Sequence, residues 1–223
     1  AILSGSNNQL TGAFNSVILG GTNSAIDGNN SVIIGGGNSF IGGDFSIAGG
    51  FHAVANEDGQ LVLSDNSTSV DFSDGIDGGR TWLTNQCNMR YTNGFYLVTG
   101  ISGGGNPNAG AELAAGANTW AVLSDENKKT NFNKVDHTET LNKVKSLDVK
   151  EFTYKSDKEA GRNKKYIGAM AQDFHKTFDF GDDCDKLSID TLQADGVLLS
   201  AIKGLIDKVE QLENKIEVLE NEK

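Results

Sequence analysis

Hydrophobic and polar positions repeat every fifteen residues along the first quarter of the chain. Residues 15–21 read Asn-Ser-Val-Ile-Leu-Gly-Gly, residues 30–36 read Asn-Ser-Val-Ile-Ile-Gly-Gly, and residues 45–50 repeat a shorter form. Half-repeats at residues 23–26 and 38–41 fall about half a period later. Each repeat therefore predicts two short strands separated by Gly, Asn or Asp turns, and stacked units of this kind form a β-solenoid.

The strands of the repeat are apolar at consecutive positions, as in residues 17–19 and 32–34. Consecutive side chains of a strand point to opposite faces of a sheet, so both faces of these strands need cover. The interior of the solenoid covers one face. Residues 1–56 contain no Lys or Arg, and no helix is predicted before residue 130. We therefore expect an identical chain to cover the other face.

A different period governs the C-terminal end of the chain. Apolar residues there alternate spacings of four and three, and charged residues lie around them, which is typical of a coiled coil. We predict a long helix over about residues 191–223. The apolar seam consists of Leu198, Ile202, Leu205, Val209, Leu212, Ile216 and Leu219.

The segments between these two patterns predict further strands and then helices. Apolar runs at residues 61–63, 82–83 and 95–98 lie between turn residues and predict strands. Asp136, with Glu139 three residues later, predicts the start of a helix. The fold class is therefore a mainly β N-terminal half, followed by an α+β region that ends in a long helix.

Aromatic and small residues add two elements to the α+β region. Phe152 and Tyr154 on one side, and Tyr166 on the other, flank the polar residues 155–165 and predict a hairpin. Residues 169–177 predict another short helix.

Composition and charge exclude several classes of protein. The 28 glycines have no three-residue period, which excludes collagen. The net charge of -11 and the absence of a basic patch exclude nucleic-acid binding. No apolar run is long enough to insert into a membrane.

Neither the two cysteines nor the three histidines have the spacing of a metal site, so we expect no metal and no cofactor. The chain begins without Met, and we expect it to be a C-terminal fragment of a longer protein.

Ser124 and Lys129 are the candidate catalytic residues. A serine hydroxyl is a weak nucleophile, and a lysine can remove its proton if burial keeps the amine neutral. Residues five apart lie about 140° apart around a helix and on opposite faces of a strand. A turn or a second copy of the chain must therefore bring the two side chains together. The alternative is that Ser124 caps a turn and Lys129 is a solvated surface base.

The fifteen-residue motif resembles the head repeats of trimeric autotransporter adhesins of the YadA type. The resemblance covers about residues 1–55 and is carried by the Asn-Ser-Val-Ile-x-Gly-Gly pattern. It implies a left-handed parallel β-roll in a threefold bundle.

The second half of the chain is similar to the intramolecular chaperone domain at the C-termini of phage tail spikes and fibres, a family that includes the endosialidase tail spikes. The motifs are Ser-Asp-Glu-Asn-Lys-Lys-Thr-Asn at residues 124–131, Ile-Gly-Ala-Met-Ala-Gln at residues 167–172, Ala-Asp-Gly at residues 194–196, and the terminal coiled coil. The resemblance implies a trimeric module that aligns and folds three chains and then cuts itself off.

Carried over by position, the resemblance makes Ser124 the nucleophile, Lys129 the general base and Leu123–Ser124 the scissile bond. Asn127 stands where the family pattern often has Arg. The expected domains are residues 1–56 as β-roll repeats, 57–123 as a β-rich trimeric connector or tip, and 124–223 as the chaperone domain.

These features predict the C-terminal part of an extracellular homotrimeric fibre or adhesin, on a cell surface or a virion tail. Its expected partners are itself, as a parallel homotrimer, and a surface receptor or glycan on a target cell. Any enzymatic activity would be a single self-cleavage by a serine-lysine autoprotease, and no activity on an external substrate is expected. The alternative is a non-cleaving trimeric adhesin tip in which the chaperone-like domain is a permanent cap.

Overall fold

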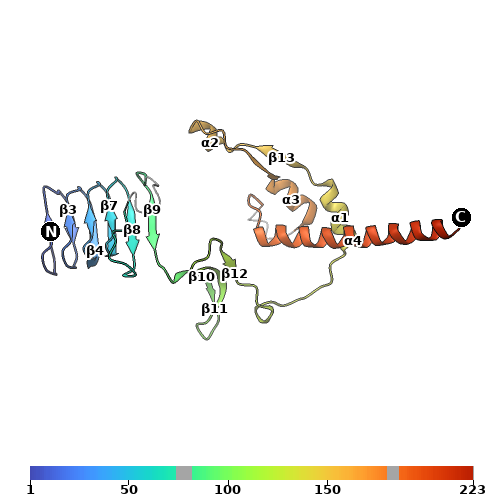
Figure 1. The fold of residues 1–223 in the computed structure, drawn as a ribbon, viewed down its shortest axis with the longest axis horizontal. Helices are drawn as coiled ribbons and strands as arrows, with labels where there is room; N and C mark the ends of the chain where they lie inside the picture. The colour runs from blue at the N-terminus through green and yellow to red at the C-terminus, as the bar shows by residue number, and fades with distance from the viewer. Residues whose placement is uncertain (74–81, 180–185, 223) are drawn as a thin grey trace. The chain divides into compact units, whose positions relative to one another are not determined.

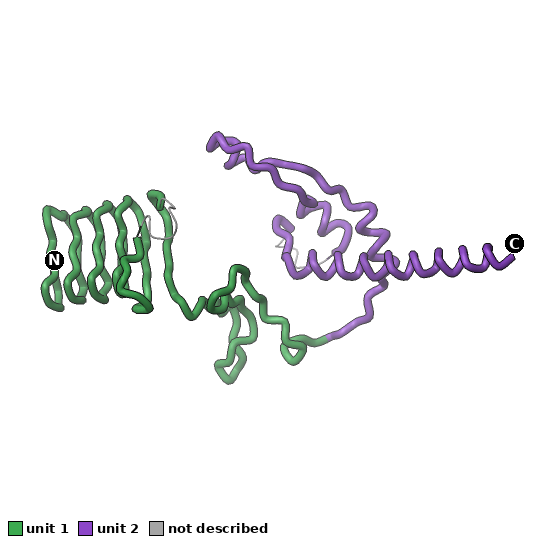
Figure 2. Tube along the Cα trace, in the orientation of Figure 1, with its two compact units in different colours: residues 1–130 green, residues 131–223 purple. Residues whose placement is uncertain are grey.

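The computed structural model describes residues 1–73, 82–179 and 186–222. They belong to two compact units, Ala1–Thr130 and Asn131–Lys223, which Figure 2 shows in green and purple. No helix among the described residues has the length and apolar character that crossing a membrane requires.

The first unit begins with a parallel β-solenoid, in which the strands stack one beside the next (Figure 1). Strand neighbours pair at the predicted repeat, with Val17 opposite Val32 and Val32 opposite Ile47. The predicted β-solenoid is thus confirmed. The larger sheet has the order β2 (Val17–Ile18), β4 (Val32–Gly37), β6 (Ile47–Phe51), β8 (Leu61–Ser64) and β9 (Cys87–Arg90). The smaller sheet has the order β1 (Gln9–Leu10), β3 (Ala25–Ile26), β5 (Phe40–Ile41) and β7 (Val54–Ala55).

The Asn-Ser pair of each motif forms the corner between successive strands. Asn15 and Asn30 have φ angles of 55° and 53°, in the left-handed region that Asn tolerates. The Asn15 side-chain amide donates to Asn30 Oδ1 at 3.3 Å. The buried Ser31 hydroxyl donates to Gly43 O at 3.1 Å and accepts the Ser46 N–H at 3.0 Å. Each coil is therefore hydrogen-bonded to the next through its corner as well as through its strands.

The strands bury one face and leave the other open. The middle residues Ile18 and Ile33 are 0% exposed and lie in the solenoid core, with Ile26 and Ile41 of the smaller sheet. Ile34, the next residue of β4, is 53% exposed. One chain therefore covers one face only, and the outer apolar face of the larger sheet remains open to a partner.

Phe45 occupies the corner position that is Asn15 and Asn30 in the preceding coils, and it has the same left-handed backbone conformation. Its φ is 55°, and the residue is 67% exposed. A non-Gly, non-Asn residue is strained there by about 1–2 kcal/mol. We expect Phe45→Asn to raise the melting temperature of the protein by a few degrees, measured by differential scanning calorimetry.

Phe14→Asn is the matched control for this substitution. Phe14 is also largely exposed, at 74% against 67% for Phe45, but its φ is not positive, so its replacement should leave the melting temperature nearly unchanged. A lower melting temperature for Phe45→Asn than for Phe14→Asn would contradict the strain argument.

The larger sheet continues beyond the predicted repeats, and the predicted strand at residues 82–83 is wrong. Leu61 pairs with Cys87, so the next partner of β8 in this sheet lies 26 residues further along the chain, and Phe72 in between pairs with Ala53. The backbone of Leu83 bonds to side chains instead of a strand: its N–H donates to Gln86 Oε1 at 2.8 Å, and its carbonyl accepts from Gln60 Nε2 at 3.3 Å. Trp82 is buried at the end of the solenoid core.

An antiparallel sheet completes the first unit, with the order β10 (Gly94–Ile101), β11 (Pro107–Ala114) and β12 (Ala121–Val122). Several of its apolar side chains are exposed, among them Leu97 at 57% and Val122 at 50%. This sheet, like the solenoid, leaves apolar surface uncovered in one chain.

The second unit contains the predicted helices and hairpin. Its elements are α1 (His137–Ser146), β13 (Val149–Phe152), α2 (Lys155–Glu159), β14 (Tyr166–Ala169), α3 (Ala171–Phe178) and α4 (Thr191–Asn221). The Asp136 carboxylate accepts the Glu139 N–H at 2.9 Å and caps α1 as predicted. Strands β13 and β14 pair antiparallel, with Phe152 opposite Tyr166.

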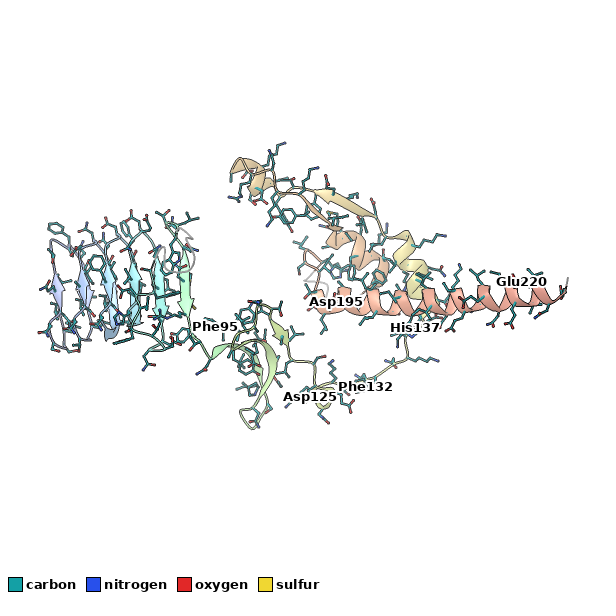
Figure 3. The ribbon with its side chains drawn as sticks, in the orientation of Figure 1. Phe95, Asp125, Phe132, His137, Asp195 and Glu220 are labelled. Atoms are coloured by element: carbon teal, nitrogen blue, oxygen red, sulfur yellow. The ribbon has the colours of Figure 1, made fainter. Side chains whose placement is uncertain are left out.

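Helix α4 has one face packed within the chain and one face open. The packed face includes Val197 and Gly204: Val197 joins Phe174 and Phe178 in a core cluster, and a Cβ on Gly204 would collide with the His137 carbonyl. Figure 3 shows His137 beside α4, where its Nδ1 lies 2.9 Å from Ser200 Oγ. The predicted seam residues, by contrast, are each 45–60% exposed.

Candidate functional site

The residues on the N-terminal side of Ser124 are held by the sheet of the first unit. Val122 pairs with Ala111 in the β11–β12 ladder, and the Leu123 N–H donates to Gly110 O at 3.3 Å. Leu123 is half-buried, whereas Ser124 is exposed. The peptide that enters Ser124 is therefore anchored to a strand up to the bond before the serine.

A one-turn 3-10 helix, η1 (Glu126–Lys128), follows Ser124. Figure 3 labels Asp125, the residue that begins this turn. The Asp125 carboxylate accepts the Asn127 N–H and the Asn127 side-chain amide, both at 2.9 Å from Oδ1. The Lys129 N–H donates to Glu126 O at 3.0 Å and closes the end of the turn.

The turn brings Ser124 and Lys129 together. Lys129 Nζ donates to Ser124 Oγ at 2.6 Å, and both side chains are exposed in the single chain. The five-residue spacing had left a turn or a second copy as the two ways to make this contact. Within one chain the turn is sufficient.

Asp125 is a functional candidate that the spacing argument missed. The signal was present in the sequence, since Asp before a turn, with Asn two residues later, is a capping pattern. The hydrogen bonds from the Asn127 backbone and side chain, together with the charges of Lys128 and Lys129, lower the pKa of Asp125 below its ordinary value. Its contribution to the turn is therefore complete at neutral pH and is lost only as the pH falls through the lowered pKa.

The arrangement fits acyl transfer at the Leu123–Ser124 bond. A hydroxyl with an amine in hydrogen-bond reach has the geometry of a nucleophile and its general base. The Leu123 carbonyl carbon is the nearest acyl group along the chain, because it is bonded to the nitrogen of Ser124 itself. The base must be a neutral amine, and burial is what disfavours the charged form of a lysine.

The other polar clusters of the described residues have structural contacts. His52 Nδ1 lies 2.6 Å from Asp71, and His175 Nε2 lies 2.8 Å from Ser188 O. The carboxylate of Asp157 accepts from Arg162 at 2.7 Å and from the Tyr166 hydroxyl at 3.0 Å, which lowers its pKa and ties α2 to β14. No group of three His, Cys, Asp or Glu residues in residues 1–73, 82–179 and 186–222 is arranged to hold a metal ion.

Comparison with known proteins identifies one part of the chain. No curated protein matches it. The parallel pairing of the solenoid strands agrees with one feature that the adhesin resemblance implies, but no finding assigns residues 1–55 to that family. Residues 124–180 match the family model described as chaperone of endosialidase, so the similarity begins at Ser124 and includes Lys129.

Proposed function

We propose that the chain is the C-terminal part of a homotrimeric extracellular fibre or adhesin, whose residues from Ser124 onward form a chaperone that cuts itself off. The observation that carries this proposal is that the family match and the Ser124–Lys129 contact begin at the same residue. The match to the chaperone family starts at Ser124, the residue whose hydroxyl Lys129 contacts at 2.6 Å. A surface receptor or glycan on a target cell is the proposed ligand of the fibre that remains.

In the proposed reaction, Lys129 Nζ takes the proton of the Ser124 hydroxyl, and Oγ attacks the Leu123 carbonyl carbon. The carbon–nitrogen bond breaks, the Ser124 nitrogen takes the proton, and Leu123 is left as an ester on Oγ. Water then hydrolyses the ester. The products are a carboxylate at Leu123 and a free amine at Ser124, so the reaction consumes one water and needs no cofactor.

Homotrimer formation is supported by the apolar surface that one chain leaves open. The α4 seam and the outer face of the larger solenoid sheet both carry exposed aliphatic side chains, such as Ile216 at 55% and Ile34 at 53%. Contiguous apolar surface of this kind marks an interaction site.

The charges beside the α4 seam favour a parallel, in-register arrangement of identical helices. In that arrangement, flanking residues five apart in sequence face each other across the seam. Lys208 would meet Glu213, and Lys215 would meet Glu220. Holding three chain ends together in register raises their effective concentration and offsets the entropic cost of aligning three solenoids.

The exposure of Ser124 and Lys129 favours one alternative, a chaperone-like domain that stays attached as a permanent cap. A single chain does not provide the burial that would favour a neutral lysine. In the preferred function, the neighbouring chains of the trimer provide that cover, so cleavage follows assembly. In the alternative, the contact between Lys129 and Ser124 only stabilises the turn.

The intact mass of the freshly purified chain, measured under denaturing conditions, separates the two functions. We expect two fragments that divide at Leu123–Ser124, with a C-terminal fragment that begins Ser-Asp-Glu-Asn. Sedimentation equilibrium of the native sample should give a trimer. One full-length species in a trimeric sample would support the permanent cap, and a stable monomer would contradict both.

A further inference from the structure

The turn between Ser124 and Lys129 is stabilised by its own residues. None of the η1 residues is buried. An isolated helical turn is costly to form, because it fixes several backbone angles for few hydrogen bonds. The bonds that Asp125 accepts from Asn127 are therefore a large part of what keeps the turn closed.

Asp125 has the backbone and the bonds of an N-cap residue. Its φ and ψ are -64° and 129°, which is extended, and its carboxylate accepts the N–H two residues later. The backbone becomes extended again at Lys129, with φ -121° and ψ 160°. The chain is thus extended on both sides of one helical turn, and across this turn Lys129 Nζ lies 2.6 Å from Ser124 Oγ.

We propose that Asp125 and Asn127 are positioning residues of the cleavage site, and that their paired hydrogen bonds hold η1 closed so that Lys129 Nζ reaches Ser124 Oγ. This inference rests on the proposed function and adds to it the residues that influence the rate of cleavage. Asn127 supplies two donors to one carboxylate, and it stands at the position where the resembling family often has Arg.

The first test is the rate of Leu123–Ser124 cleavage after cell-free synthesis of the full chain. We expect Asp125→Ala to cleave about tenfold more slowly than the parent, as for the loss of an N-cap. Asp125→Asn should restore most of the rate, because its side-chain oxygen can still accept the Asn127 N–H. Asn127→Ala keeps the backbone bond and loses only the side-chain one, so we expect a reduction of about two- to threefold.

Glu126→Ala is the matched control, since it removes an adjacent carboxylate that makes no side-chain hydrogen bond to the described residues. It should cleave at the parent rate. All the variants should assemble to the same degree as the parent, which distinguishes positioning from a folding defect.

A second readout does not depend on cleavage. In the Ser124→Ala background, which keeps the chain whole, the amide protons of Asn127 and Lys129 should exchange with solvent several-fold faster when Asp125 is also replaced by Ala, as solvent-exchange NMR would measure. Unchanged amide exchange would overturn the inference, even if the parent chain proved not to cut itself. Cleavage of Asp125→Ala at the parent rate would overturn it while leaving the proposed function intact.

Discussion

Ser124→Ala and Lys129→Ala should each leave the chain as one full-length species, while the parent divides at Leu123–Ser124. Ser124→Ala removes the oxygen that attacks, and Lys129→Ala removes the amine that lies 2.6 Å from it. Loss of a nucleophile or its base lowers the rate of such reactions by about a thousandfold or more. Intact mass spectrometry over a time course measures the effect.

Lys129→Arg separates a base from a structural hydrogen bond. A guanidinium can donate to Ser124 Oγ, but it cannot accept a proton, because Arg stays protonated in proteins. We therefore expect Lys129→Arg to be as inactive as Lys129→Ala. Cleavage by Lys129→Arg at a rate near that of the parent would rule out Lys129 as the base.

Lys128→Ala is the matched control for these variants. Lys128 is adjacent to Lys129, carries the same charge and lies in the same turn, but its hydrogen bond within the turn is made by its backbone N–H, which donates to Asp125 O. Alanine keeps that bond. Lys128→Ala should therefore cleave at close to the parent rate.

The solenoid could be predicted from the sequence because each contact joins equivalent positions of neighbouring repeats. Ser31 bonds to Ser46, and Val32 pairs with Ile47, so one motif specifies both partners. The pairing of Leu61 with Cys87 could not be predicted in this way. The inserted residues interrupt the period, and the pairing depends on packing at the end of the solenoid.

The two reacting residues of the candidate site could be predicted from the sequence, but the residues that hold them in position could not. A serine and a lysine five apart suggested a dyad, and the spacing required either a turn or a second copy of the chain. The turn depends on hydrogen bonds between Asp125 and Asn127. Short polar side chains can form several alternative local hydrogen bonds, and the sequence alone does not show which of them forms. Lys129 is exposed in the single chain, so a single chain does not provide the burial that would keep its amine neutral.

Ile216→Asp should prevent the assembly of soluble trimer, because it places three carboxylates in the centre of the proposed seam. An uncompensated charge in a packed seam costs several kcal/mol per assembly. Ile216 is a cleaner choice than Leu205, whose neighbour Gly204 packs against α1 within the chain. Light scattering and the yield of soluble protein measure the result.

Val218→Asp is a close match for this change, because Val218 lies two residues away on the same helix and is equally exposed, at 56% against 55% for Ile216. Both substitutions add one negative charge near the C-terminal end of α4, so their effect on the helix itself is the same. Only Ile216 belongs to the proposed seam. Val218→Asp should therefore yield trimer, and if Ile216→Asp also yields trimer in parent amounts, α4 does not drive assembly and its apolar stripe must serve another contact.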